Sequence, residues 1–190
     1  MQRFEDVFGK YIEKNCYNAP LRESEVVGLQ IATEDNAIRV ALSSPCIIPY
    51  SAIAEAQRIL SMNLSACSVA ISARYPSELL GPEAFSLVID YLKAANVPVN
   101  GFFRRAEIMY DNRCFTVRLP EQTVTFLEPL ALPGKIAAQA EALFGIRPQV
   151  SFIPVPDYEL KPIDPRPTVV DDYIPEIPPI PEEAPPWEDA

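Results

Sequence analysis

The sequence predicts an α+β protein in which helices pack on one face of mixed sheets that are built from hairpins. Alternating apolar and polar residues at 27–42 and again at 104–119 are each interrupted by a short polar turn, the pattern of a β-hairpin. Segments with apolar residues three or four positions apart follow each hairpin, a spacing typical of amphipathic helices. Hairpins with helices between them favour α+β layers.

Residues 1–95 are predicted to contain an amphipathic helix at 4–12 and then a β-β-α-β-α part. The first hairpin turns at "TEDN" and is expected to be a ribbon with one buried face. The apolar residues of that face are Val27, Leu29, Ile31, Ile38, Val40 and Leu42.

Three further elements complete this first part. A helix is predicted to begin near Ser51, which we expect to be its N-cap, and to present Ile53, Ala56, Ile59 and Leu60 to the core. The run "ACSVAISARYP" is rich in small and β-branched residues and predicts a strand in the centre of its sheet. Pro82 is expected to start a helix that extends to about Ala95.

Residues 96–154 are predicted to form a β-β-α-α-β part that can pack with residues 1–95 as one domain. Its hairpin is expected to turn at Asp111–Asn112, and two short helices at 121–130 and 133–144 follow, with Gly145 as the stop of the second. The strand "PQVSFIP" ends at Pro154. Both parts share the order hairpin, helix, strand, without aligned residues that would establish a repeat.

Residues 155–190 differ in composition from the rest of the chain. Eleven of the 21 prolines lie between Pro154 and Pro186, and from residue 155 onward ten acids against two basic residues give −8 of the formal net charge of −10. Such a segment is predicted to be a disordered, extended linker to a further domain. An alternative is that "PEIPPIP" docks in an aromatic groove of a partner.

The chain lacks the residue patterns of common catalytic and metal sites. It contains no histidine, no CxxC spacing and no glycine-rich phosphate loop, so we expect no catalytic residues, no cofactor, no metal site and no small-molecule substrate. Cys16, Cys46, Cys67 and Cys114 have apolar neighbours and are expected to be buried. No apolar run approaches the roughly 20 residues of a membrane span, and the N-terminus lacks the pattern of a signal peptide, so a cytoplasmic location is expected.

Basic and aromatic residues alternate around the second hairpin. Such a mixture can bind single-stranded nucleic acid by pairing with phosphates and stacking on bases. The alternative is that the aromatic rings point inward and the arginines form a solvated outer face, with nearby acids cancelling their charge. The residues concerned are Phe102, Phe103, Arg104, Arg105, Tyr110, Arg113, Phe115 and Arg118.

Residues 48–153 resemble the N-terminal region of PolC-type DNA polymerase III, the replicative polymerase of low-GC Gram-positive bacteria. The stretches that carry the resemblance are "IPYSAIAEAQRIL", "SVAISARYP", "PEAFSLVIDYLKAANVPVNGFF", "AEIMYDNRCFTVRLP" and "KIAAQAEALFGIRPQVSFIP". In that family the second part is similar to the polymerase-binding C-terminal domain of the clamp-loader τ subunit, a truncated KH-like fold. A linker then leads to an OB-fold, a PHP domain with an inserted 3′–5′ exonuclease, and the DNA-directed DNA polymerase.

The resemblance implies a non-catalytic protein-interaction module that acts in DNA replication. The family's catalytic residues lie in later domains, so none is carried over to this sequence, and the GxxG loop of KH domains is absent around Gly101. The expected partners are replisome proteins or other domains of the polymerase, and Phe102, Phe103, Arg104 and Arg105 are the candidate contacts. The alternative is a nucleic-acid-binding module that uses Arg104, Arg105, Arg113 and Arg118.

Overall fold

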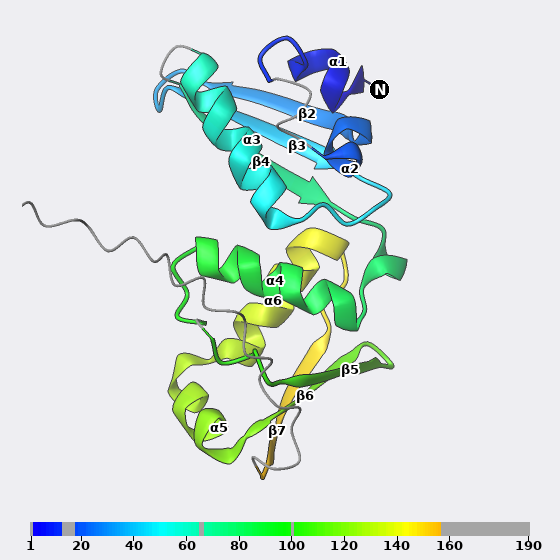
Figure 1. Cartoon of the computed structure of the whole chain (residues 1–190), viewed down its shortest axis with the longest axis vertical. Helices are drawn as coiled ribbons and strands as arrows, with labels where there is room; N and C mark the ends of the chain where they lie inside the picture. The colour runs from blue at the N-terminus through cyan, green and yellow to red at the C-terminus, as the bar shows by residue number, and fades with distance from the viewer. Residues whose placement is uncertain (1, 13–17, 65–66, 100, 157–190) are drawn as a thin grey trace, which may run out of the picture.

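The computed structural model describes residues 2–12, 18–64, 67–99 and 101–156 of the chain and contains two sheets (Figure 1). The first sheet has the strand order β1-β2-β3-β4, and the second has the order β5-β6-β7. The strands are β1 (Gln2–Arg3), β2 (Glu25–Ala32), β3 (Ala37–Ser43), β4 (Ser68–Arg74), β5 (Glu107–Asp111), β6 (Cys114–Pro120) and β7 (Gln149–Val155). The helices are α1 (Phe4–Phe8), α2 (Ala19–Glu23), α3 (Tyr50–Asn63), α4 (Pro82–Ala94), α5 (Glu121–Leu127) and α6 (Leu132–Phe144), with 3₁₀ turns at Ser77–Leu79 and Glu128–Leu130.

The two sheets follow the same chain path. In each, an antiparallel hairpin is followed by a helical crossover and a third strand that runs parallel to the second strand of the hairpin. The middle strand of these three is therefore β3 in the first sheet and β6 in the second, and the short β1 is added next to β2 in the first. This arrangement confirms the α+β class and the predicted order of elements.

Helices cover one face of the first sheet, as predicted. Along β4, Val69, Ile71 and Ala73 are buried and alternate with exposed residues, so the opposite face of the strand is open to solvent. The inner side of α3 buries Ile53, Ala56 and Leu60 in the same core. The predicted N-cap is wrong, because Pro49 occupies that position and Ser51 lies inside the first turn.

The strand β4 lies at an edge of its sheet and not in the centre, so that prediction is wrong. Its edge is closed by side chains of α3. The amide of Val69 donates to Ser61 Oγ at 3.0 Å, and the amide of Ile71 donates to Gln57 Oε1 at 2.7 Å. Two polar side chains of α3 thus accept hydrogen bonds that the carbonyl groups of a neighbouring strand would otherwise accept.

The first hairpin has the predicted strands, but its apolar residues are not all buried. Val40 and Leu42 are in the core, whereas Leu29 and Ile31, opposite Val40 and Ile38, are 53% and 67% exposed. A β-bulge between Val26 and Gly28 also takes Val27 out of the expected alternation. The prediction of one continuous buried face is therefore wrong for β2.

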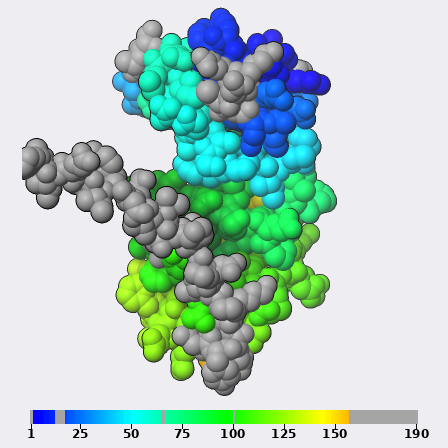
Figure 2. Space-filling model, viewed as in Figure 1, coloured from blue at the N-terminus to red at the C-terminus, as the bar shows by residue number. Residues whose placement is uncertain are grey.

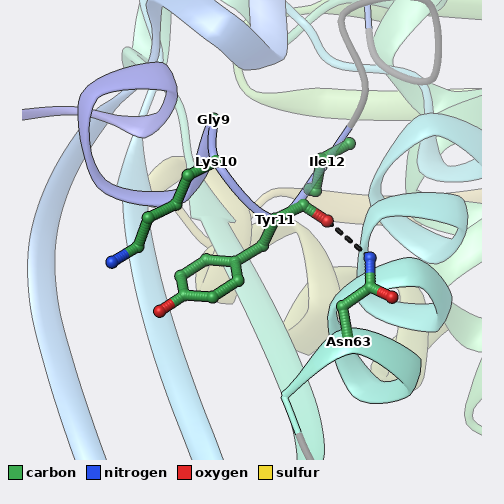
Figure 3. A pocket seen from close by; sticks show the side chains of 5 residues that line it. All are labelled: Gly9, Lys10, Tyr11, Ile12 and Asn63. Atoms are coloured by element: carbon green, nitrogen blue, oxygen red, sulfur yellow. Dashed lines mark hydrogen bonds between the residues drawn. The ribbon is translucent and has the colours of Figure 1, made fainter.

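The N-terminal segment is helical only as far as Phe8, which is shorter than predicted. The chain then turns, and Ile12 is still buried together with Phe4 and Phe8. Asn63 at the end of α3 donates from Nδ2 to the carbonyl oxygen of Tyr11 at 2.6 Å, across a cavity of about 420 Å³ (Figure 3). This contact joins the turn to the end of α3. The short helix α2, which was not predicted, follows along the chain.

The helices α4 and α6 lie between the two sheets (Figure 1), and the two halves meet directly in the space-filling view (Figure 2). The helix α4 contacts α6 and β5 as well as α3. The amide of Tyr75 donates to the carbonyl oxygen of Leu143 in α6 at 2.8 Å, and its ring lies 5.4 Å from that of Phe144. One cluster of buried residues extends through both halves, and a domain boundary at residues 95–96 stays a prediction.

The second sheet agrees closely with its predicted elements. Gly145 ends α6 with φ = 71°, a left-handed conformation that favours glycine. The hairpin turn lies at Asn112–Arg113, both with positive φ, one residue later than expected. Val155 belongs to β7 and is buried, so the linker predicted from residue 155 cannot include it. The rest of that predicted linker, from residue 157, lies outside the described residues.

The cysteines are less buried than predicted. Cys46 is exposed, and Cys67 and Cys114 are half-buried, while Cys16 lies outside the described residues. Ser44 Oγ donates to the carbonyl oxygen of Cys46 at 2.7 Å, and this tight turn directs the Cys46 side chain to solvent although Ile48 nearby is buried. Apolar neighbours in the sequence therefore do not determine the orientation of these thiols.

Two tyrosines at the junction of the sheets predict a loss of stability in alkali. Burial raises the pKa of Tyr75 to about 12, and burial, reinforced by Tyr75 and Tyr50, raises the pKa of Tyr91 further. Tyrosines of the unfolded chain ionise near pH 10, so above that pH the unfolded state binds fewer protons than the folded state. The stabilisation is complete below about pH 10 and is lost as the pH rises toward about 12.

Urea titrations at a series of alkaline pH values measure this loss as a falling free energy of unfolding. The conservative control is the Tyr75→Phe/Tyr91→Phe variant, which lacks both titrating hydroxyls and is expected to have a flatter dependence on pH. Equal slopes for the variant and the natural chain would contradict the assignment to these two groups.

Candidate partner-binding surface

The turn that precedes β5 brings two neighbouring, half-buried phenylalanines against different aromatic partners. Gly101 has φ = 77°, which a residue with a Cβ adopts only with strain, and its carbonyl oxygen accepts from the amide of Arg104 at 3.3 Å. Phe103 then turns inward, where its ring lies 5.4 Å from Phe85 and 6.0 Å from Phe152. Phe102 turns instead toward α5 and packs against Phe126, with the ring centroids 5.2 Å apart.

The pair Phe102 and Phe126 forms an apolar feature on the surface. Phe126 is 60% exposed, although a phenylalanine is among the residue types most often buried. Next to Phe102 is a cavity of about 390 Å³ between the turn and the start of α5. Its lining consists of Gly101, Phe102, Arg104, Arg105, Pro120, Gln122 and Thr123. We call Phe102, Phe126, Arg104 and Arg105 the Phe102–Phe126 surface.

The two arginines of this surface differ in exposure. Arg104 is exposed and also lines a second cavity of about 380 Å³ on the other side of the turn, beside Asp90 and Lys93 of α4. Arg105 is half-buried and has an interaction partner. Within the described part of the chain, no ion pair holds the Arg104 guanidinium, so it is open to a partner's carboxylate.

The structure does not bring the four predicted arginines together. Arg118 pairs with Glu107 across the hairpin, with Nη1 and Oε2 2.7 Å apart. Arg113 lies at the tip of the hairpin, and the five residues of β5 separate it from Arg105 by roughly 17 Å at 3.3 Å per residue. The aromatic residues do not form one exposed surface either. Phe115 is fully buried, and its ring centroid lies 4.6 Å from that of the half-buried Tyr110.

Phe126 is a candidate contact residue that sequence reasoning missed. In the run "EQTVTFL", Val124 and Leu127 are three positions apart and face the core, as a helical repeat requires. Phe126 is next to Leu127 and therefore falls on the outer side of α5. An aromatic residue off the inward stripe of a predicted helix is the signal that could have identified it.

The described residues, 2–12, 18–64, 67–99 and 101–156, show neither a metal centre nor a membrane-spanning helix. No group of three or more histidine, cysteine, aspartate or glutamate residues could hold a metal ion there. In the same ranges, no helix is both long enough and apolar enough to cross a membrane. In comparisons with known proteins, no protein-family model and no curated sequence matches the chain.

Proposed function

We propose that this chain is a non-catalytic interaction module of the kind found at the N-terminus of PolC-type DNA polymerase III. It binds a replisome protein or another domain of the polymerase through the Phe102–Phe126 surface, and it works in the cytoplasm. The observation that supports this proposal best is the solvent-exposed ring of Phe126, held by Phe102 next to an unpaired arginine.

The aromatic pair has the properties of a binding anchor. Aromatic residues and arginine are enriched in protein interfaces, where a few of them carry most of the binding free energy. Phe126 is already stacked on Phe102, so a partner that covers it loses less side-chain entropy than it would on ordering a free ring. Its exposed area is apolar and would be removed from water on binding.

The neighbouring cavity and Arg104 indicate the chemistry of the partner. A cavity of about 390 Å³ next to Phe102 has room for one or two side chains of a partner. The exposed guanidinium of Arg104 can form a bidentate pair with a carboxylate. The partner segment that fits best therefore presents an apolar side chain flanked by an acidic residue.

Affinity measurements with purified replisome proteins test the proposal. Phe126→Ala is expected to weaken binding by about 30-fold, corresponding to about 2 kcal/mol for a central aromatic anchor. The matched control is Met62→Ala, which truncates a 69% exposed apolar residue on α3, far along the chain from this surface. Equal affinities for Phe126→Ala and the control, or binding by no replisome protein, would count against the proposal.

The arrangement gives less support to binding of single-stranded nucleic acid. Arg118 is already paired with Glu107, Arg113 is remote, and Phe115 is buried. A binder of this type needs cations along one groove and exposed rings for stacking. An oligonucleotide titration at two salt concentrations checks this, since phosphate contacts would give affinity that falls steeply with salt. Such a slope, abolished by Arg104→Ala, would favour this alternative.

A further inference from the structure

The outer edge of β2 is open along most of its length. β1 pairs only with Glu25 and Val26, and the bulge that follows separates this short pairing from residues 28–32. In the described ranges of the chain, no strand pairs with that edge beyond Val26. The segment Gly28–Ala32 therefore has β3 on one side and backbone groups available for hydrogen bonding on the other.

Beyond the bulge at its start, the open segment lacks the charged residues and proline by which proteins often block an edge strand. Its sequence, "GLQIA", contains no charged residue and no proline, and its two large apolar side chains, Leu29 and Ile31, are more than half exposed. At the opposite edge of the same sheet, Gln57 and Ser61 of α3 bind the amides of β4. One edge is thus closed by the protein's own side chains, and the other can accept a further strand.

The order of residues in this segment identifies the strand that fits. Read from either end, "GLQIA" runs small, apolar, amide, apolar, small. We propose that β2 pairs with β2 of a second copy of this chain, antiparallel, about a two-fold axis at Gln30. Gly28 then lies opposite Ala32 of the other copy, Leu29 opposite Ile31, and Gln30 opposite Gln30.

This register satisfies both the backbone and the side chains. Directly opposite residues of an antiparallel pair share a face, so each Leu29–Ile31 contact covers apolar surface that is exposed in the single chain. No like charges meet along the five paired residues. Two-fold pairing uses the β2 edge of both copies at once, so this contact joins two chains and adds no third copy.

The flanking residues limit the pairing to the segment Gly28–Ala32. Continuing the register places the turn residues Glu34 and Asp35 of one copy opposite Val26 and Glu25 of the other, where β1 with the exposed Arg3 lies on the outer edge. Asp35 already pairs with Arg39 of its own chain at 3.6 Å and would face the like charge of Glu25, so the pairing gains nothing from the turn. Because β1 occupies the edge there, pairing ends after about five residues, and a dimer of modest affinity is expected. The inference does not depend on the proposed function.

Sedimentation equilibrium of the whole chain over a wide concentration range tests the dimer. The natural chain is expected to change from one to two chains in mass as its concentration rises. Ile31→Lys places two cations at the pairing edge and is expected to weaken the dimer by at least about tenfold. Met109→Lys is the matched control, a 45% exposed methionine on β5 of the other sheet, and is expected to leave the dimer unchanged.

A cross-linking experiment checks the register directly. It uses no lysine substitution, so it remains informative if Ile31→Lys fails to fold. Opposite residues in an antiparallel pair have Cα atoms about 4.5–5.5 Å apart, within the range of a disulfide. In a Cys46→Ser background, Gln30→Cys is expected to link two chains on mild oxidation. The control Gln122→Cys, exposed on α5, is expected to show no more than background linking.

Three results would overturn the proposal. They are a single-chain mass at every concentration, a dimer that persists in Ile31→Lys, and equal linking of Gln30→Cys and Gln122→Cys. A single-chain mass at every concentration would mean that any strand that pairs with this edge comes from a different protein.

Discussion

Phe85→Ala is expected to lower the free energy of unfolding by about 3–5 kcal/mol, the range for loss of a fully buried phenylalanine. Phe85 lies on α4 and is 1% exposed. Its ring meets Phe103 from the turn before β5 and Phe115 from β6, each at 5.4 Å in an edge-to-face arrangement. Truncation therefore removes both aromatic contacts and leaves a cavity between the helix layer and the second sheet.

Urea unfolding followed by circular dichroism measures this change. The control is Phe126→Ala, which removes the same group from a 60% exposed site and, with its ring contact to Phe102, is expected to lower the free energy of unfolding by only about 0.5–1.5 kcal/mol. A stability loss for Phe85→Ala that is no larger than the loss for this control would contradict the packing described here. Comparing the two variants also distinguishes the contribution of a buried aromatic residue to stability from that of an exposed one in the same half.

The helices α4 and α6 could be predicted well because local signals and tertiary contacts agree for them. Pro82 begins α4, Gly145 ends α6, and the apolar residues between follow a helical repeat that the core then buries. The hairpins could be predicted from alternation for a similar reason. The exact turn position of the second hairpin is harder to predict. Asn112 and Arg113 both adopt positive φ, and arginine gives no sequence signal for this conformation.

Features that depend on contacts between distant segments could not be predicted from local pattern. β4 has the composition of a central strand, yet its neighbour on one side is a set of helix side chains, Gln57 and Ser61. Leu29 and Ile31 alternate as a buried strand does, but the helices leave the β2 side of the sheet uncovered. Ile12 is buried by a turn and not by the longer helix that its spacing predicts.

The candidate surface shows the same limit at the level of single residues. The sequence indicated Phe102, Phe103, Arg104 and Arg105 as a group, and all four lie in one turn. Their directions depend on Gly101 and on which rings are available nearby, so Phe103 joins the core while Phe102 meets Phe126. Composition grouped the four residues, and only the fold shows that the Phe103 ring packs near Phe85 and Phe152 while the Phe102 ring packs near Phe126.

Removal of residues 1–12 is expected to destabilise the first sheet by about 4.5–9 kcal/mol. This range follows from loss of three buried apolar side chains, each contributing about 1.5–3 kcal/mol. Phe4, Phe8 and Ile12 are all less than 5% exposed, and the rings of Phe4 and Phe8 lie 5.0 Å apart. The deletion also removes β1 and so lengthens the open edge of β2. A typical domain is stable by only about 5–15 kcal/mol, so unfolding of this half is the expected outcome.

Amide hydrogen exchange resolves the effect by region. Amides of β2 and β3 are expected to lose most of their protection in the deletion variant, while those of β6 and α6 keep theirs if the second half holds its fold. Phe4→Ala is expected to give an intermediate loss of about 3–5 kcal/mol. Lys10→Ala, which removes an exposed cation lying 4.7 Å from the Tyr11 ring, is the matched control and is expected to cost about 1 kcal/mol or less. Undiminished protection in β2 and β3 after the deletion would show that the sheet does not need this segment as a covering layer.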